Sequence, residues 1–238
     1  MSSRINPLLA SLKGGLIVSC QAKEGDPFND PQSITGFARA AELGGAVGIR
    51  AQGVANIRAV KAAVKLPVIG MIKSRYADGA VLITPDFEAV ENIVKSGADL
   101  VALDVTQRIR PNGLSGPDFL REVKRHFSVP LMADISTFEE GGTAAEAGAD
   151  VIATTLSGYT PYTRDKLERG PDFDLIEKLT AAIDWPIIAE GRIWTPAEAQ
   201  RCLELGAFAV VVGTAITRPQ ALTQRFVEAM AQFAYRDR

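Results

Sequence analysis

Eight short apolar runs alternate along this chain with polar segments of helical periodicity, and each run ends in a polar residue. Such continuous runs, bounded by Gly and Pro, are typical of strands that are buried on both faces. The repeated order of strand and helix predicts a parallel barrel, a single-domain (β/α)8 barrel that spans residues 1–238. The eight runs lie at residues 15–21, 45–50, 66–73, 97–104, 129–134, 148–155, 185–190 and 206–214.

Gly and Pro mark the start of most of these runs. Gly45, Gly97, Gly148 and Gly206 each stand before an alanine, and we expect each glycine to end a helix in the left-handed conformation. Three other runs follow a proline, which is tolerated near the first residue of a strand because no ladder donor is lost there.

Two helix starts are readable from local residues. Thr84 before Pro85 predicts a capping threonine with proline at the first helical position. Thr195 before Pro196 predicts the same arrangement, and Glu198 completes a capping box. Amphipathic stretches at residues 37–43, 57–64 and 221–233 are expected to supply helices of the outer ring.

Composition narrows the class of protein. Apolar residues make up 47% of the chain, and the formal charge of −2 comes from interspersed acids and bases, so we expect no nucleic-acid partner. No apolar run approaches membrane-spanning length, and residues 1–7 lack the apolar stretch of a signal peptide. Two cysteines make no disulfide framework. We therefore expect a soluble cytoplasmic protein, and the oligomeric state stays open, with a homodimer considered.

The residues that end the runs are candidates for chemistry, because barrels of this kind carry their active site at the carboxyl ends of the strands. A single polar residue at a strand end is ordinary, but several acids and bases that converge on one mouth indicate a ligand. The eight positions are Gln21, Arg50, Lys73, Asp104, Asp134, Thr155, Glu190 and Thr214.

The last two runs predict a phosphate site. Gly191 and Arg192 follow the seventh run, and Gly213 and Thr214 end the eighth, just before a short helical start. Loops in these positions commonly bind phosphate in this fold, since glycine lets backbone N–H groups approach the anion. Arg218 lies a few residues further on and, like Arg192, can add charged hydrogen bonds.

Lys73 and Glu190 form a second candidate subsite. Their strands are four apart in an eight-stranded barrel, so the two side chains start on opposite sides of the mouth. A substrate carbon between them could lose a proton to one and gain a proton from the other, which suits epimerisation. An ion pair between Lys73 and a neighbouring carboxylate is the structural alternative.

No metal site is expected. His126 is the only histidine, and its position late in a helix indicates a surface or helix-end residue. No cluster of His, Cys, Asp or Glu has the spacing of metal ligands.

The chain resembles the N-acetylmannosamine-6-phosphate 2-epimerases of sialic-acid catabolism from about Gly15 to Pro219. The resemblance is carried by the stretches that contain the strand-end residues, such as Val18-Ser19-Cys20-Gln21, Gly70-Met71-Ile72-Lys73, Ala189-Glu190-Gly191-Arg192 and Gly213-Thr214-Ala215-Ile216. The segment 163–171 matches least.

The resemblance implies a role for each site residue. Lys73 is implied as the acid/base at C2 and Glu190 as its catalytic partner, with their division of work left open. Gln21, Arg50, Asp104 and Asp134 are implied to hold the sugar's hydroxyl and N-acetyl groups, and Tyr159 to border the sugar. The residues implied to bind the 6-phosphate are Gly191, Arg192, Gly213, Thr214 and Arg218. The reaction of this family needs no metal and no redox cofactor, and its substrate is a small amino-sugar phosphate.

Two other functions fit the same fold. In a Schiff-base aldolase or lyase Lys73 would be a nucleophile. A phosphosugar-binding regulator without catalysis would need the phosphate site alone.

Overall fold

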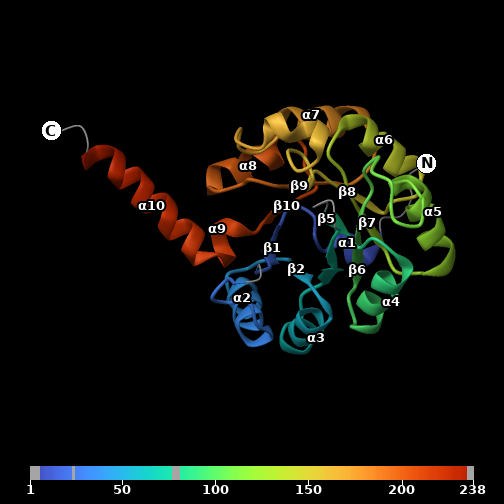
Figure 1. The fold of residues 1–238 in the computed structure, drawn as a ribbon, viewed down its shortest axis with the longest axis horizontal. Helices are drawn as coiled ribbons and strands as arrows, with labels where there is room; N and C mark the ends of the chain where they lie inside the picture. Colours follow the sequence, from blue (N-terminus) through green and yellow to red (C-terminus); the bar gives the residue numbers. More distant parts are fainter. Residues whose placement is uncertain (1–5, 23–24, 77–80, 235–238) are drawn as a thin grey trace.

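A computed structural model describes residues 6–22, 25–76 and 81–234, and it shows a closed barrel of parallel strands with helices around it (Figure 1). The barrel strands are β1 (Leu16–Cys20), β2 (Gly48–Gln52), β3 (Val68–Met71), β6 (Leu100–Asp104), β7 (Leu131–Asp134), β8 (Val151–Ala153), β9 (Ile187–Glu190) and β10 (Ala209–Val212). Each predicted apolar run overlaps one of these strands, so the predicted (β/α)8 barrel is confirmed. The prediction that residues 1–7 are not a signal peptide concerns mainly residues 1–5, which lie outside the described ranges.

Closure of the barrel pairs its first strand with its last. The strands follow the order β1-β10-β9-β8-β7-β6-β3-β2, and β1 pairs in parallel with both β2 and β10. In the closing ladder, Leu16, Ile17 and Val18 lie opposite Val210, Val211 and Val212.

Helices cover the outside of the sheet. They are α2 (Pro31–Leu43), α3 (Val54–Ala63), α4 (Phe87–Lys95), α5 (Gly116–His126), α6 (Phe138–Glu146), α7 (Phe173–Ala182) and α8 (Pro196–Glu204). The predicted capping box of Thr195 and Glu198 is present at the start of α8. The four predicted helix-ending glycines have φ between 86° and 93°, the left-handed conformation that glycine tolerates, and each precedes its strand by three residues.

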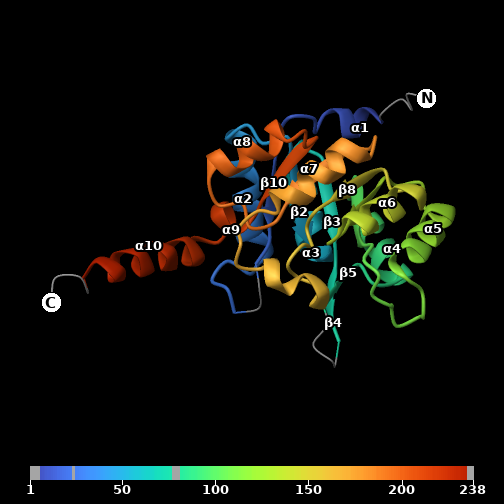
Figure 2. The same cartoon turned by 90° about the horizontal axis from the view of Figure 1, so that it is seen from above.

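The interior of the barrel is apolar at one end. Ile17, Ile69, Met132 and Val211 point inward and pack with Leu12, which follows the short helix α1 (Pro7–Ala10). Helix α1 therefore closes the end of the barrel at which the strands begin (Figure 2).

A two-stranded antiparallel hairpin projects from the opposite end (Figure 2). It consists of β4 (Lys73–Arg75) and β5 (Val81–Ile83). The predicted third strand, residues 66–73, is thus two elements: β3 ends at Met71, and Lys73 begins the hairpin. The apolar run gave no sign of the break because Ile72 continues it.

The predicted helix start at Thr84 is wrong. Helix α4 begins at Phe87, and Asp86 is its cap, with a side chain that accepts a hydrogen bond from the N–H of Ala89. Asp86 competes successfully because its carboxylate is a strong N-cap acceptor, while the backbone of Thr84 is bonded to Ile72 in the hairpin.

The predicted helix at residues 221–233 exists as α10 (Pro219–Ala234), which follows the short helix α9 (Thr214–Thr217), but its place in the outer ring is wrong. Figures 1 and 2 show α10 leaving the barrel as an arm. Its amphipathic pattern predicts a buried face, but the apolar residues of that face, Leu222, Phe226, Val227 and Met230, are exposed in the structure.

None of the helices in the described part of the chain combines the length and the apolarity that a membrane crossing needs.

Candidate active site

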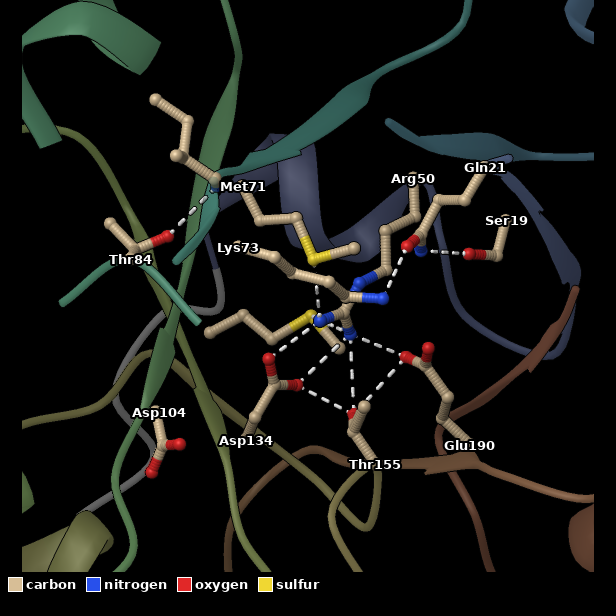
Figure 3. Close-up of polar contacts among 12 residues, drawn as sticks. Ser19, Gln21, Arg50, Met71, Lys73, Thr84, Asp104, Asp134, Thr155 and Glu190 are labelled. Atoms are coloured by element: carbon tan, nitrogen blue, oxygen red, sulfur yellow. Dashed lines mark hydrogen bonds and ion pairs between the residues drawn. The ribbon is translucent and has the colours of Figure 1, made fainter. Parts of the chain in front are cut away.

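An arginine from β2 lies at the centre of the barrel mouth and holds two carboxylates (Figure 3). Arg50 donates from both terminal nitrogens to Asp134, at 2.9 and 2.6 Å, and from one of them to Glu190 Oε2, at 2.5 Å. The hydroxyl of Thr155 lies 2.6 Å from Asp134 Oδ1 and 3.2 Å from Glu190 Oε2. Strands β2, β7 and β9 are thereby joined through one cation.

The charged side chains of this cluster are buried, and burial shifts their pKa values. The side chains of Arg50 and Asp134 are 0% exposed, and that of Glu190 is 11% exposed. Burial raises the pKa of the Glu190 carboxyl, the charge of Arg50 opposes the rise, and the charge of Asp134 adds to it. Burial alone would lower the pKa of Arg50, but the charges of Asp134 and Glu190 raise it by more. The net pKa is raised, and the guanidinium stays charged.

Arg50 binds Glu190 and Asp134 unequally. One cation faces two carboxylates, and Asp134 takes the bidentate share of its hydrogen bonds. Within the described part of the chain, Glu190 makes its side-chain contacts through Oε2. Its Oε1 takes no part in these contacts, and burial raises the pKa of the carboxyl.

Lys73 approaches the same mouth from the hairpin. Its Nζ lies 2.8 Å from Gln21 Oε1, and the Gln21 amide in turn donates to Ser19 Oγ at 2.5 Å (Figure 3). The two predicted catalytic residues thus come from separate elements, Lys73 from β4 and Glu190 from β9. Ser19, which helps to orient Gln21, was missed by sequence reasoning, although it has the inward parity of Ile17 and Gln21.

Asp104 belongs to a different set of contacts. It is fully buried at the end of β6, where it accepts from the hydroxyl of Thr106 at 2.7 Å and pairs with the guanidinium of Arg108. Burial raises the pKa of Asp104, and the charge of Arg108 opposes that rise. Figure 3 shows Asp104 apart from the Arg50 cluster. Sequence reasoning found Asp104 but missed Arg108, which carries no motif of its own.

Arg192 has a left-handed backbone and a side chain that is already engaged. Its φ is 58°, after Gly191 with φ 117°. Its Nε lies 2.5 Å from the carbonyl oxygen of Gly170, and a terminal nitrogen donates to the carbonyl of Ser157. The guanidinium also lies 5.8 Å from the ring centroid of Tyr159, which is exposed. The side chain therefore fastens the loop between β8 and α7.

Arg218 likewise has a partner in the structure. It follows α9 and makes a two-pronged contact with Asp26, at 3.1 Å from Nε and 3.2 Å from a terminal nitrogen. Asp26 lies in the loop after β1, 192 positions away, and sequence reasoning gave no sign of it. Gly213 and Thr214 stand at the start of α9, and a Cβ at Gly213 would lie 3.2 Å from Cβ of Ser19.

His126 is the exposed last residue of α5, as expected for a helix-end residue. Its Nδ1 lies 2.8 Å from the carbonyl oxygen of Glu122. In the ranges that the structure describes, no three His, Cys, Asp or Glu side chains lie so as to hold a metal ion.

The fold and the site together define a class. A closed parallel barrel with a lysine, a buried carboxylate pair and an arginine at the carboxyl ends of its strands is a (β/α)8-barrel enzyme with acid–base groups at its mouth.

Comparisons with known proteins give the family. The model of the family described as "Putative N-acetylmannosamine-6-phosphate epimerase" matches residues 34–232. A relative from Caldanaerobacter subterraneus subsp. tengcongensis with the name "Putative N-acetylmannosamine-6-phosphate 2-epimerase" is 52% identical and is aligned over 96% of each chain. One of the same name from Clostridioides difficile is 47% identical over 94% of this chain and 99% of its own. The chain belongs to this family.

Solved structures agree. The N-acetylmannosamine-6-phosphate 2-epimerase from Clostridium perfringens superposes with a TM-score of 0.88 and 44% identity, over 96% of this chain and 99% of that one. The thiamine phosphate pyrophosphorylase from Pyrococcus furiosus superposes with a TM-score of 0.57 at 16% identity, over 89% of this chain and 93% of that one, and shows the fold alone.

Proposed function

We propose that this chain interconverts N-acetylmannosamine 6-phosphate and N-acetylglucosamine 6-phosphate by removing and returning the proton at C2. Membership of the family supports the substrate. The observation that carries the chemistry is the presence of a lysine amine and a buried carboxylate of raised pKa at one barrel mouth, supplied by different elements.

In this proposal Lys73 and Glu190 serve the two faces of C2. One group takes the C2 proton, and the electron pair of the broken C–H bond moves into the neighbouring C1 carbonyl of the open-chain sugar. The intermediate is planar at C2, so a proton delivered from the other face inverts the configuration. Arg50 holds Glu190 in place through Oε2 and leaves Oε1 for the substrate.

The other site residues bind or support. Gln21 and Tyr159 contact the sugar in this proposal, because Gln21 lies beside Lys73 and Tyr159 is exposed in the loop after β8. The fully buried Arg50 and Asp134 hold Glu190 in place, and the buried Asp104 holds Arg108 at the end of β6.

The 6-phosphate is assigned to the loops after β9 and β10. The backbone N–H groups of Gly191, Arg192, Gly213 and Thr214 would face the anion, and Arg218 would add charge. This role for Arg192 uses its backbone, since its guanidinium is bonded to two carbonyl groups of the neighbouring loop.

The proposal includes a cytoplasmic location. It is supported by Cys20 and Cys202, which are both buried and unpaired, as is usual for cysteines in a reducing compartment.

Conversion in D₂O tests the reaction. N-acetylmannosamine 6-phosphate is incubated with the protein, and NMR follows the product and the hydrogen at its C2. We expect N-acetylglucosamine 6-phosphate with solvent deuterium at C2. Product that keeps its original hydrogen over many turnovers would contradict two-base transfer. Binding without any turnover would favour the regulator, and a borohydride-trapped adduct at Lys73 would favour the Schiff-base enzyme.

We further propose that the protein is a homodimer that exchanges α10. Leu222, Phe226, Val227 and Met230 lie exposed on this arm, Phe226 at 65% and Met230 at 71%. An apolar groove of about 560 Å³ lies on the barrel beside β10. The long helix that follows β10 in the chain, α10, leaves the barrel instead of packing there. Its apolar lining includes Leu16, Trp194, Leu203, Val210, Val212 and Ile216.

The exposed face of α10 and this groove fit a second copy of the chain. In a two-fold dimer each arm would complete the outer ring of its partner, so the same contact would form twice. The root of the arm stays with its own barrel, where the Arg225 guanidinium stacks 4.0 Å from the ring centroid of Trp194.

Light scattering tests this assembly. The wild type should have twice the chain mass of 25.4 kDa, and the double variant Phe226→Asp/Met230→Asp should lose the dimer. Gln224→Asp, on the other side of the same helix, should keep it. A monomeric wild type, or a double variant that stays dimeric, would contradict the exchange.

A further inference from the structure

Lys73 owes its place to the point at which the chain leaves the barrel. Strand β3 ends at Met71, and Lys73 pairs with Ile83 as the first residue of the hairpin. Ile72 is the only residue between the two elements. The orientation of its backbone therefore sets the direction in which the Lys73 side chain starts.

Thr84 holds both backbone groups of Ile72. The N–H of Thr84 donates to the Ile72 carbonyl at 2.6 Å. The N–H of Ile72 donates to the Thr84 hydroxyl at 3.3 Å, the dashed line at Thr84 in Figure 3. Thr84 is 0% exposed, so water does not compete for these bonds. Thr84 thus closes the hairpin at its base through bonds to Ile72, the residue next to Lys73.

The backbone of Thr84 is strained. Its φ is 51°, and among the described residues only Arg192 shares a positive φ without being glycine. This region is disfavoured for all residues except glycine, and most of all for a β-branched one. Such conformations persist where the surroundings impose them, and they concentrate at functional sites. A glycine would relieve the strain, but it would lack the hydroxyl that binds Ile72.

Helix capping does not explain this residue. Asp86 caps α4 through a 2.8 Å bond from the N–H of Ala89. The hydroxyl of Thr84 is directed to the hairpin instead of the helix.

We propose that Thr84 is a positioning residue for Lys73. By holding the N–H and the carbonyl of Ile72, it fixes the path along which the lysine reaches the mouth, where Nζ lies 2.8 Å from Gln21 Oε1. The catalytic consequence rests on the proposed function of Lys73, while the structural statement does not.

Three variants separate the hydroxyl from the strain. Thr84→Val removes the acceptor and keeps the branched shape, Thr84→Ser keeps the hydroxyl, and Thr84→Gly permits the positive φ without a hydroxyl. We expect kcat to fall on the order of tenfold to a hundredfold in the Val variant, because small misplacements of a reacting group have effects of this size. KM should change less, by about twofold, since the loops proposed to bind the phosphate follow β9 and β10. The Ser variant should retain kcat, and Thr143→Val on α6 serves as control.

A second readout needs no turnover. Reductive methylation with ¹³C-formaldehyde gives Lys73 an NMR signal, identified by its loss in Lys73→Arg. That signal should move in Thr84→Val and Thr84→Gly and stay in place in Thr84→Ser and Thr143→Val. If the wild type does not turn over the sugar phosphate, the function fails while this signal still tests the positioning.

Wild-type kcat and an unmoved Lys73 signal in Thr84→Val would overturn the proposal. So would equal impairment of the Ser and Val variants, because the hydroxyl would then be irrelevant. If Thr84→Val fails to fold, Thr84→Gly carries the same test without the strain, and wild-type kcat in that variant would also overturn it.

Discussion

Replacing Arg50 by Met should destabilise the fold strongly, and more so as the pH rises. The guanidinium is fully buried and bonded to both Asp134 and Glu190, so its removal leaves two carboxylates facing each other without a cation. The methionine fills a similar volume, which limits the loss of packing and leaves the lost charge as the main perturbation.

The size of the effect follows from the burial of the pair. Removing one partner of a buried ion pair costs about 3–5 kcal/mol, because the remaining charge is uncompensated. For a domain of this length each kcal/mol lowers Tm by about 2–4 °C, so a decrease of roughly 6–20 °C is expected. Lys61→Met is the matched control. Its pair with Asp99 is 30% and 27% exposed, and such pairs are worth less than about 1 kcal/mol.

The pH dependence gives the sharper test. Arg50 lowers the pKa of Glu190, so its removal leaves that pKa raised further above the value in the unfolded chain. A raised folded-state pKa means stability that is present at low pH and lost as the pH rises through it. The Tm gap between wild type and Arg50→Met should therefore widen from about pH 5 to about pH 8. Scanning calorimetry across this range measures it. A gap of less than about 2 °C at the upper pH, or one that narrows as the pH rises, would refute the electrostatic account.

The remaining predictions concern activity. Lys73→Ala should remain folded and lose epimerase activity by ~10²–10⁴-fold, whereas Lys61→Ala should keep it; near-wild-type turnover of a folded Lys73→Ala would rule out its role. Because burial raises the pKa of Glu190, kcat/KM should fall on the acid side at a pH above the ordinary carboxyl value of 4.5 in the direction in which Glu190 takes the proton, and an acid limb at or below 4.5 would contradict the raised pKa. Arg218→Ala should weaken binding of the phosphorylated sugar on the order of tenfold to a hundredfold, as expected for a lost charge-assisted hydrogen bond. An equal loss with unphosphorylated N-acetylmannosamine would instead indicate that Arg218 acts by anchoring Asp26.

Much of the fold was predictable because buried parallel strands leave a plain signal. Most strands are apolar runs, and their inward residues recur at every second position. Asp104, Asp134 and Glu190 therefore share the inward parity of Ala102, Met132 and Ile188 in the core. Their convergence at the mouth follows from the topology of a parallel barrel alone.

What escaped prediction depends on contacts between distant residues. Thr84 looked like a helix cap because Pro85 follows it, and only the hairpin shows that its hydrogen bonds go to Ile72. The pair of Arg218 and Asp26 joins loops with no local motif. The amphipathic pattern of α10 defines a helix with an apolar face, but no single-chain pattern states which molecule covers that face.

The closing ladder between β1 and β10 also bears on how the chain is made. Ribosomes synthesise a protein from its N-terminus, so β1 emerges about 190 residues before its second partner strand, β10. Until then β1 has one unpaired edge, and Arg50 can meet Asp134 before it can meet Glu190. An exposed edge of apolar residues is a template for pairing with other chains. The nascent protein is therefore most prone to misassembly just before its last strand arrives, and slowing synthesis at that point would lengthen the exposure.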